Sequence, residues 1–167
     1  MAVAAACVLA RSIPPVGAHA GTADGSRPFV ASVEPALPGI AASAVFAGSW
    51  QVNLSVVNDQ AVSVLDDNNR AFLRIGRAGV EADDAAPAWF TSAVAPNASG
   101  LVRLPDGVGP DTPPHWRPVS RATAWAWFDP RIRSEPGAVT PDMVRKAVPV
   151  RLRDFAIPLR VGDHLAQ

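Results

Sequence analysis

Hydrophobic and polar residues alternate most regularly over residues 50–56. The apolar positions are Trp50, Val52, Leu54 and Val56, and the positions between them are Gln51, Asn53 and Ser55. Successive side chains of a β-strand point to opposite faces of the sheet, so a period of two separates a buried face from a hydrated one. These residues are therefore predicted to form a half-buried strand.

Shorter apolar runs, separated by residues that favour turns, predict further strands along the chain. They cover residues 29–33, 40–46, 61–65, 72–75, 80–82, 116–120 and 123–128, with a final strand pair or bulged strand between 152 and 161. The Asp and Asn residues at 66–69 tolerate left-handed backbone, so residues 62–75 are predicted to form a hairpin. Gly76 and Gly79 bracket a second tight turn, and Trp89-Phe90 is predicted to lie in a short strand or a covering loop.

Two irregular features complete the predicted fold. Residues 93–114 are rich in Gly, Pro, Asp and Ser without any period, so they are expected to form one long irregular loop. The 17 prolines disfavour long helices, and at most one short helical turn is expected, near 141–146, with Thr140 as its cap. The fold class predicted from these elements is all-β, an immunoglobulin-like β-sandwich of about seven to nine short strands.

The first 20 residues have the features of an export leader. Residues 2–10 form a short apolar stretch, and Ala18-His19-Ala20 is an A-x-A cleavage signal. The stretch is half the ~20 residues that span a bilayer, so it is not expected to anchor the chain. No positive residue precedes it, so either the true start lies upstream of Met1 or the leader is simply rich in alanine.

The remaining residues are divided into a linker at 21–27, a single β-sandwich domain at 28–162 and a tail at 163–167. The cysteine, Cys7, lies in the leader, so the mature chain is expected to have neither disulfides nor thiol chemistry. Basic and acidic residues number 15 each and form no basic stripe, which excludes nucleic acid as a partner. No apolar run is long enough to predict a transmembrane segment.

Three groups of polar residues suggest site chemistry but lack the required spacing. Residues 66–69 offer oxygen ligands for calcium, yet the D-x-D-x-D-G spacing and a distal Glu are missing, which favours a turn. Asp83-Asp84 is interpreted as a solvated pair in a loop, with no facing carboxylate for acid–base work. His115 and His164 have no Cys or His companion, so no metal site is predicted. Nucleophile and phosphate-binding motifs are also missing, so no catalytic residue and no cofactor are predicted.

The run from Thr123 to Arg131 concentrates aromatic side chains where a strand meets a turn. Trp125 and Trp127 are predicted to share one face of the strand, which ends at Asp129-Pro130. The tryptophans on predicted strands are Trp50, Trp116, Trp125 and Trp127, and most of them are expected to fill the core.

Two arginines follow this strand end. Arg131 and Arg133 are close enough to Asp129 to lock the turn or to stack on an indole ring. If the domain has a contact surface for a ligand or partner, it is expected at this strand end, formed by Trp125, Trp127, Asp129, Arg131 and Arg133. The loop at 93–114 is the second candidate.

Five segments resemble an uncharacterised family of exported, often membrane-anchored β-sandwich domains of actinobacteria. They are residues 72–80 (FLRIGRAGV, against YLRIGPDGV), 87–90 (PAWF), 114–120 (PHWRPVS, against PRWxxVS), 125–131 (WAWFDPR, against WxWHDHR) and 154–159 (DFAIPL, against DWxVPL). The similarity covers residues 29–161. This chain has Phe128 and Pro130 where many relatives have two histidines, so a histidine-based metal site is not predicted there.

The resemblance implies a place outside the cytoplasm, secreted or associated with the cell envelope, and no established activity. The predicted function is a non-enzymatic extracytoplasmic module of the bacterial cell envelope, with a binding or structural role and an unknown envelope protein or ligand as its partner. The alternative is a small-ligand binding protein for carbohydrate or metal. Two or more coplanar tryptophan rings facing solvent would favour carbohydrate, whereas buried rings would favour the interaction module.

Overall fold

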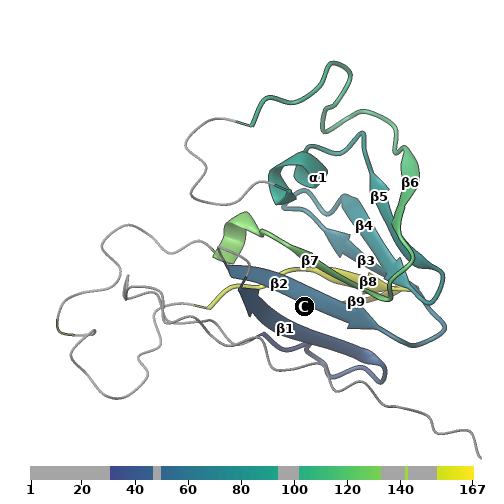
Figure 1. Ribbon diagram of the computed structural model, residues 1–167, viewed down its shortest axis with the longest axis vertical. Helices are drawn as coiled ribbons and strands as arrows, with labels where there is room; N and C mark the ends of the chain where they lie inside the picture. Colours follow the sequence, from purple (N-terminus) through teal and green to yellow (C-terminus); the bar gives the residue numbers. More distant parts are fainter. Residues whose placement is uncertain (1–30, 47–49, 94–101, 133–141, 143–153) are drawn as a thin grey trace, which may run out of the picture.

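The structure, a computed structural model, describes residues 31–46, 50–93, 102–132, 142 and 154–167. These residues are mostly β, with nine strands in two antiparallel sheets (Figure 1). The small sheet has the order β1-β2-β7, and the large sheet has the order β6-β5-β4-β3-β8-β9. The strands are β1 (Ile40–Phe46), β2 (Trp50–Val56), β3 (Val62–Leu65), β4 (Ala71–Gly76), β5 (Gly79–Asp83), β6 (Trp116–Ser120), β7 (Ala124–Trp127), β8 (Leu159–Val161) and β9 (His164–Ala166).

The two sheets share one hydrophobic core. The small sheet contributes Val52, Leu54, Val56 and Trp127, and the large sheet contributes Val62, Val64, Leu73, Ile75 and Val80. In β2 the three valine and leucine positions are buried, whereas Gln51, Asn53 and Ser55 between them are partly exposed. The strand predicted from the period of two is therefore confirmed, and its apolar face forms part of the core.

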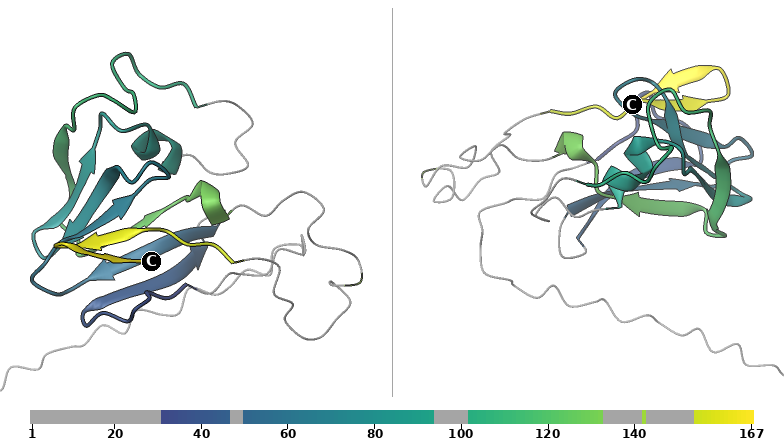
Figure 2. Two further views of the ribbon diagram at one scale, coloured as in Figure 1. Left: turned by 180° about the vertical axis from the view of Figure 1, so that it is seen from behind. Right: turned by 90° about the horizontal axis from the view of Figure 1, so that it is seen from above.

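The chain order explains how the two sheets are connected. β3 and β4 form the predicted hairpin, with Val62 opposite Ile75, and β4 turns into β5 where Gly76 stands opposite Gly79. After β6 the chain turns a corner and leaves the large sheet, so that β7 pairs with β2 of the small sheet (Figure 2). Although β6 and β7 are separated by only a short connection, they belong to different sheets.

One predicted strand or loop is a helix. Trp89 and Phe90 lie in α1 (Pro87–Ser92), so the prediction of a strand or covering loop was wrong, as was the expectation of at most one helical turn near 141–146. Pro87 occupies the first turn, where its missing N–H costs no hydrogen bond, and Ala86 before it is extended. The amide of Trp89 donates to the carbonyl of Ala86, which closes the first turn.

The two ends of the domain also differ from the prediction. Of the strand predicted at 29–33, residues 31–33 are not a strand, and residues 29–30 lie outside the described residues. The helical turn expected near 141–146 also lies outside them, except for Asp142. Instead of a tail, residues 163–167 contain β9, which pairs with β8. Two backbone hydrogen bonds then join Gln167 to Glu34. The described part of the predicted long loop, 102–114, contains no helix or strand, as expected.

Gly79 is required by the close approach of β5 to the end of β6. Its φ is 123°, and a Cβ at this position would overlap the backbone carbonyl oxygen of Ser120. We expect Gly79→Ala to lower the free energy of unfolding by about 2–3 kcal/mol, measured by urea denaturation. Gly107→Ala is the control, because Gly107 has a φ of 83° but open space around it. Equal losses in the two variants would show that the contact with Ser120 is not the cause.

Candidate functional site

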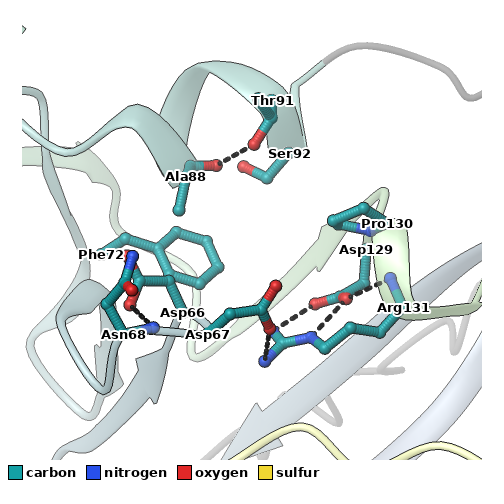
Figure 3. A pocket seen from close by; sticks show the side chains of 10 residues that line it. All are labelled: Asp66, Asp67, Asn68, Phe72, Ala88, Thr91, Ser92, Asp129, Pro130 and Arg131. Carbon is teal, nitrogen blue, oxygen red and sulfur yellow. Dashed lines mark hydrogen bonds and ion pairs between the residues drawn. The ribbon is translucent and has the colours of Figure 1, made fainter. Parts of the chain in front are cut away.

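Three segments that are distant in sequence surround a hollow of about 180 Å³ (Figure 3). One wall is the turn at 66–68 that follows β3, with Phe72 of β4 beside it. The second wall is α1, and the third is the chain just after β7, at 129–131. We refer to the space between these walls as the hollow.

The third wall is built around a buried carboxylate. Only 1% of Asp129 is exposed, and its two oxygens accept four hydrogen bonds. Oδ1 accepts from the backbone N–H of Arg131 (3.0 Å) and from its Nε (2.7 Å). Oδ2 accepts from Nη2 of Arg131 (2.8 Å) and from the indole Nε1 of Trp127 (2.9 Å). An Asp that ends a strand commonly bonds the N–H two residues later, so this arrangement starts from a local turn.

Arg131 connects this turn to the large sheet. Its Nη1 and Nη2 both lie 3.2 Å from the carbonyl oxygen of Leu65, the last residue of β3. Nη1 also forms an ion pair of 3.4 Å with Asp67 (Figure 3). The guanidinium therefore joins the end of β7 in the small sheet to the end of β3 in the large sheet.

The electrostatics of the pair favour the ionised state of both groups. Burial by itself raises the pKa of the Asp129 carboxyl, but the N–H donors of Arg131 and Trp127 and the positive charge of Arg131 outweigh burial. The net effect lowers the pKa of Asp129 from its usual value of 3.8. Burial likewise lowers the pKa of Arg131, yet its bonds to Asp129 outweigh this effect and raise it.

The turn at 66–69 holds its own shape. Oδ1 of Asp66 accepts hydrogen bonds from the backbone N–H groups of Asn68 (2.8 Å) and Arg70 (2.9 Å), and Asn69 adopts a φ of 60°. The turn interpretation of these residues is therefore confirmed. Among the described residues, no group of three His, Cys, Asp or Glu side chains could hold a metal ion.

The wall formed by α1 is tied to the end of β7. The backbone N–H of Phe128 donates to the carbonyl of Ser92, the last residue of the helix, at 3.0 Å. Within the helix the hydroxyls of Thr91 and Ser92 donate to the carbonyls of Ala88 (3.2 Å) and Trp89 (2.8 Å). Both hydroxyls thereby donate their protons within the helix, and both residues line the hollow (Figure 3).

The residues proposed from the sequence as a contact surface have different environments. Trp127 is 2% exposed and fills the core, as expected for most tryptophans, and Asp129 is equally inaccessible. Trp125 is half-buried, with its ring centroid 6.2 Å from that of Trp89 at an angle of 33°, so the two rings are not coplanar. Arg131 lines the hollow, and Arg133 lies outside the described residues.

Sequence reasoning missed the walls that face Arg131. Thr91 and Ser92 were not candidates, because α1 was not predicted; Pro87, a residue favoured at the first position of a helix, is the local signal that could have revealed it. Residues 66–68 were considered only as calcium ligands. Because all three walls come from separate parts of the chain, no local spacing pattern indicates that they meet.

A second buried carboxylate lies in β5. The prediction of a solvated pair at Asp83-Asp84 was wrong for Asp83, which is fully buried and lies in the strand. It accepts hydrogen bonds from Nε (3.1 Å) and Nη2 (2.7 Å) of Arg70 and from the backbone N–H groups of Ala85 (3.1 Å) and His115 (2.8 Å). Nη1 of Arg70 continues to the carbonyls of Gly109 (2.9 Å) and Pro110 (2.8 Å), which fixes the loop.

Asp84 lies at the surface, as do His115 and His164, the two histidines considered as metal ligands. Nδ1 of His115 lies 2.6 Å from Asp84, which also pairs with Arg117 at 2.9 Å. Trp116 stacks under Arg74, whose guanidinium carbon is 3.8 Å from the ring centroid. His164 is exposed in β9. These contacts give the exposed His115 and the partly buried Trp116 partners within the domain, and Trp116 is not one of the tryptophans that fill the core.

In the part of the chain that the structure describes, no helix has the length and apolar character needed to cross a membrane. No protein-family model matches this chain, and searches of curated proteins and of solved structures find no similar protein.

Proposed function

We propose that this chain is a non-enzymatic, extracytoplasmic module of the bacterial cell envelope that binds one small polyhydroxylated group, such as a sugar ring, through the polar groups of the hollow and not on a platform of coplanar tryptophan rings, which Trp89 and Trp125 do not form. The observation that carries the proposal is the convergence of hydroxyl, amide and carboxylate groups from three separate segments on one space of about 180 Å³. Sugar hydroxyls both donate and accept hydrogen bonds, and groups of these types can satisfy them.

The size of the hollow limits the ligand. Pockets that bury drug-sized ligands enclose roughly 300–1,000 Å³, whereas a cavity of about 150 Å³ holds a six-membered ring such as benzene. A volume of about 180 Å³ therefore suits one ring of a longer glycan rather than a large ligand. Phe72, Ala88 and Pro130 supply apolar surface for the C–H groups of such a ring.

The rigidity of the walls supports binding. The hydrogen bonds of Arg131 to both carboxylate oxygens of Asp129 and to the carbonyl of Leu65 hold the guanidinium in one place. The turn at 66–69 is closed by hydrogen bonds to the Asp66 carboxylate. Groups that are held in position before a ligand arrives lose little conformational entropy on binding.

The cellular location and the finer fold class are parts of the same proposal. The A-x-A signal at 18–20 supports export, and the segments that resemble exported actinobacterial domains support a place in the envelope. Two antiparallel sheets around a shared core are compatible with an immunoglobulin-like sandwich, the architecture of many cell-surface domains.

Titration of the ¹⁵N-labelled chain with a panel of neutral monosaccharides tests this function by NMR. We expect saturable shifts of the backbone amides at 66–70, 88–93, 128–129 and 131–132 with at least one sugar. Asn68→Ala should weaken that binding several-fold, because the amide lines the hollow, whereas Asn53→Ala, on the outer face of β2, should leave it unchanged. Shifts that do not saturate, or equal binding by the two variants, would overturn the proposal.

A further inference from the structure

The four edge strands of the described sheets differ in how well they are protected against further pairing. Natural edge strands avoid association by being short or by carrying Pro, charged residues or bulges. In the large sheet, β9 has three residues, and β6 contains Pro118 and Arg117 and pairs with β5 through a register shift. In the small sheet, β7 has four residues.

The fourth edge, β1, has none of these protective features. It has seven residues, Ile-Ala-Ala-Ser-Ala-Val-Phe, without a proline or a charge, and it pairs with β2 in one continuous register along its whole length. Every second residue of an edge strand directs its N–H and C=O away from its neighbour, so β1 offers a row of backbone donors and acceptors after Ile40, whose N–H already donates to the carbonyl of Leu37.

The outer face of the small sheet places no charge near this edge. On β1 this face carries Ala41, Ser43 and Val45, all exposed, and Val45 is 38% accessible. Their partners on β2 are Ser55, Asn53 and Gln51, and those on β7 are Ala124 and Ala126. A strand that approaches β1 therefore meets small, neutral side chains. These side chains do not repel the strand, and removing water from them costs little free energy.

We propose that the strand that pairs with this edge is β1 of a second copy of the chain, antiparallel about a two-fold axis at Ser43. The sequence of β1 is self-complementary in that register. Ser43 stands opposite Ser43, 42 opposite 44, 41 opposite 45 and 40 opposite 46, so hydroxyl meets hydroxyl and apolar residue meets apolar residue. The Ser43–Ser43 pair lies on the two-fold axis, and the axis makes each of the other contacts twice, as in most homodimers.

The pairing joins the two small sheets into one six-stranded sheet with the order β7-β2-β1-β1-β2-β7. The backbone hydrogen bonds of β1 are then satisfied on both sides. This association does not depend on sugar binding, because the hollow lies at the end of β7 and not on β1.

Sedimentation equilibrium of the full chain over a concentration series tests the dimer. We expect a monomer–dimer equilibrium for the unmodified chain and a monomer for Ser43→Lys, since like charges directly opposite each other across a strand pair are destabilising. Ser55→Lys is the matched control: it adds the same charge to the same face on β2, one strand away from the edge, and should still dimerise. Circular dichroism of the three proteins checks that they fold alike.

Charge rescue makes the test specific for the register. Ser43→Lys and Ser43→Glu should each be monomeric alone and should form a heterodimer when mixed, because position 43 of one copy faces position 43 of the other. A monomeric unmodified chain, equal dissociation by both Lys variants or no heterodimer in the mixture would overturn the inference. Slow exchange of the β1 amides that point away from β2 in monomeric Ser43→Lys would also overturn it, because another segment of the same chain would then cover the edge.

Discussion

Asp129→Ala is expected to lower the free energy of unfolding by about 3 kcal/mol, the low end for breaking a buried ion pair, because Arg131 keeps its 3.4 Å ion pair with the exposed Asp67. The carboxylate accepts two side-chain N–H bonds from Arg131 and one from the indole of Trp127. Without it, the buried indole N–H loses its acceptor, and the Arg131 side chain, which is 17% exposed, keeps only its contacts with Leu65 and Asp67 among those described above. Urea unfolding at neutral pH measures the loss.

A surface ion pair provides the control for this substitution. Asp59 pairs with Arg77 at 2.6 Å, but both side chains are largely exposed to solvent. Exposed pairs contribute about 0–1 kcal/mol, so Asp59→Ala should have little effect. Similar losses in Asp59→Ala and Asp129→Ala would show that burial of the carboxylate is not what makes the pair important.

The contribution of Asp129 also depends on pH. Because its pKa is lowered from 3.8 on folding, the stabilisation is complete at pH values well above 3.8 and is lost as the pH falls through the lower pKa of the folded state. Asp129→Asn carries no titrating group at this position, so the difference in stability between it and the unmodified chain should shrink below about pH 4. A difference that is constant from neutral to acid pH would contradict this linkage.

Asp83→Ala is expected to cost a similar amount, about 3–5 kcal/mol, because it removes the acceptor of four hydrogen bonds at a fully buried position. Its neighbour Asp84 is the matched control. Asp84 forms only partly exposed pairs with His115 and Arg117, so Asp84→Ala should cost about 1 kcal/mol or less. Thermal and urea unfolding of the two variants measure the difference.

A double-mutant cycle identifies the partner of Asp83. Asp83→Ala combined with Arg70→Met should cost clearly less than the sum of the single substitutions, because the pair is then removed as a unit. Arg70→Met should also speed amide exchange at 107–109 and 111–112, since it removes the bonds to the carbonyls of Gly109 and Pro110. Additive losses would show that the two side chains stabilise the fold independently.

Much of the β-structure could be predicted from local patterns. The alternation over 50–56 and the turn residues at 66–69 and 76–79 located β2 and the hairpins, because period and turn chemistry depend on neighbouring residues. The helix α1 was missed because its six residues are too few to show a helical period, and two aromatic residues within them favour a strand. The final strand β9 was missed for a related reason: three residues show no clear alternation.

The candidate site was less predictable than the fold. The ion pair between Asp129 and Arg131 could be predicted from the sequence, because the two residues are two positions apart at a strand end. The contacts of Arg131 with Leu65 and of Arg70 with Asp83 could not, since they join residues that are 66 and 13 positions apart. Such contacts depend on which strands become neighbours, and no local pattern contains that information.

The sequence alone determined that this chain is mostly β, where most of its strands lie, and that Asp129 and Arg131 are close enough to pair. Only the tertiary structure decided that β6 and β7 belong to different sheets, that Asp83 is buried, that three separate segments enclose a hollow, and that β1 is an unprotected edge among the described strands. The physical reason is the range of the interactions. Backbone preference and side-chain period act over a few residues, whereas sheet order, burial and edge exposure arise from contacts between distant segments.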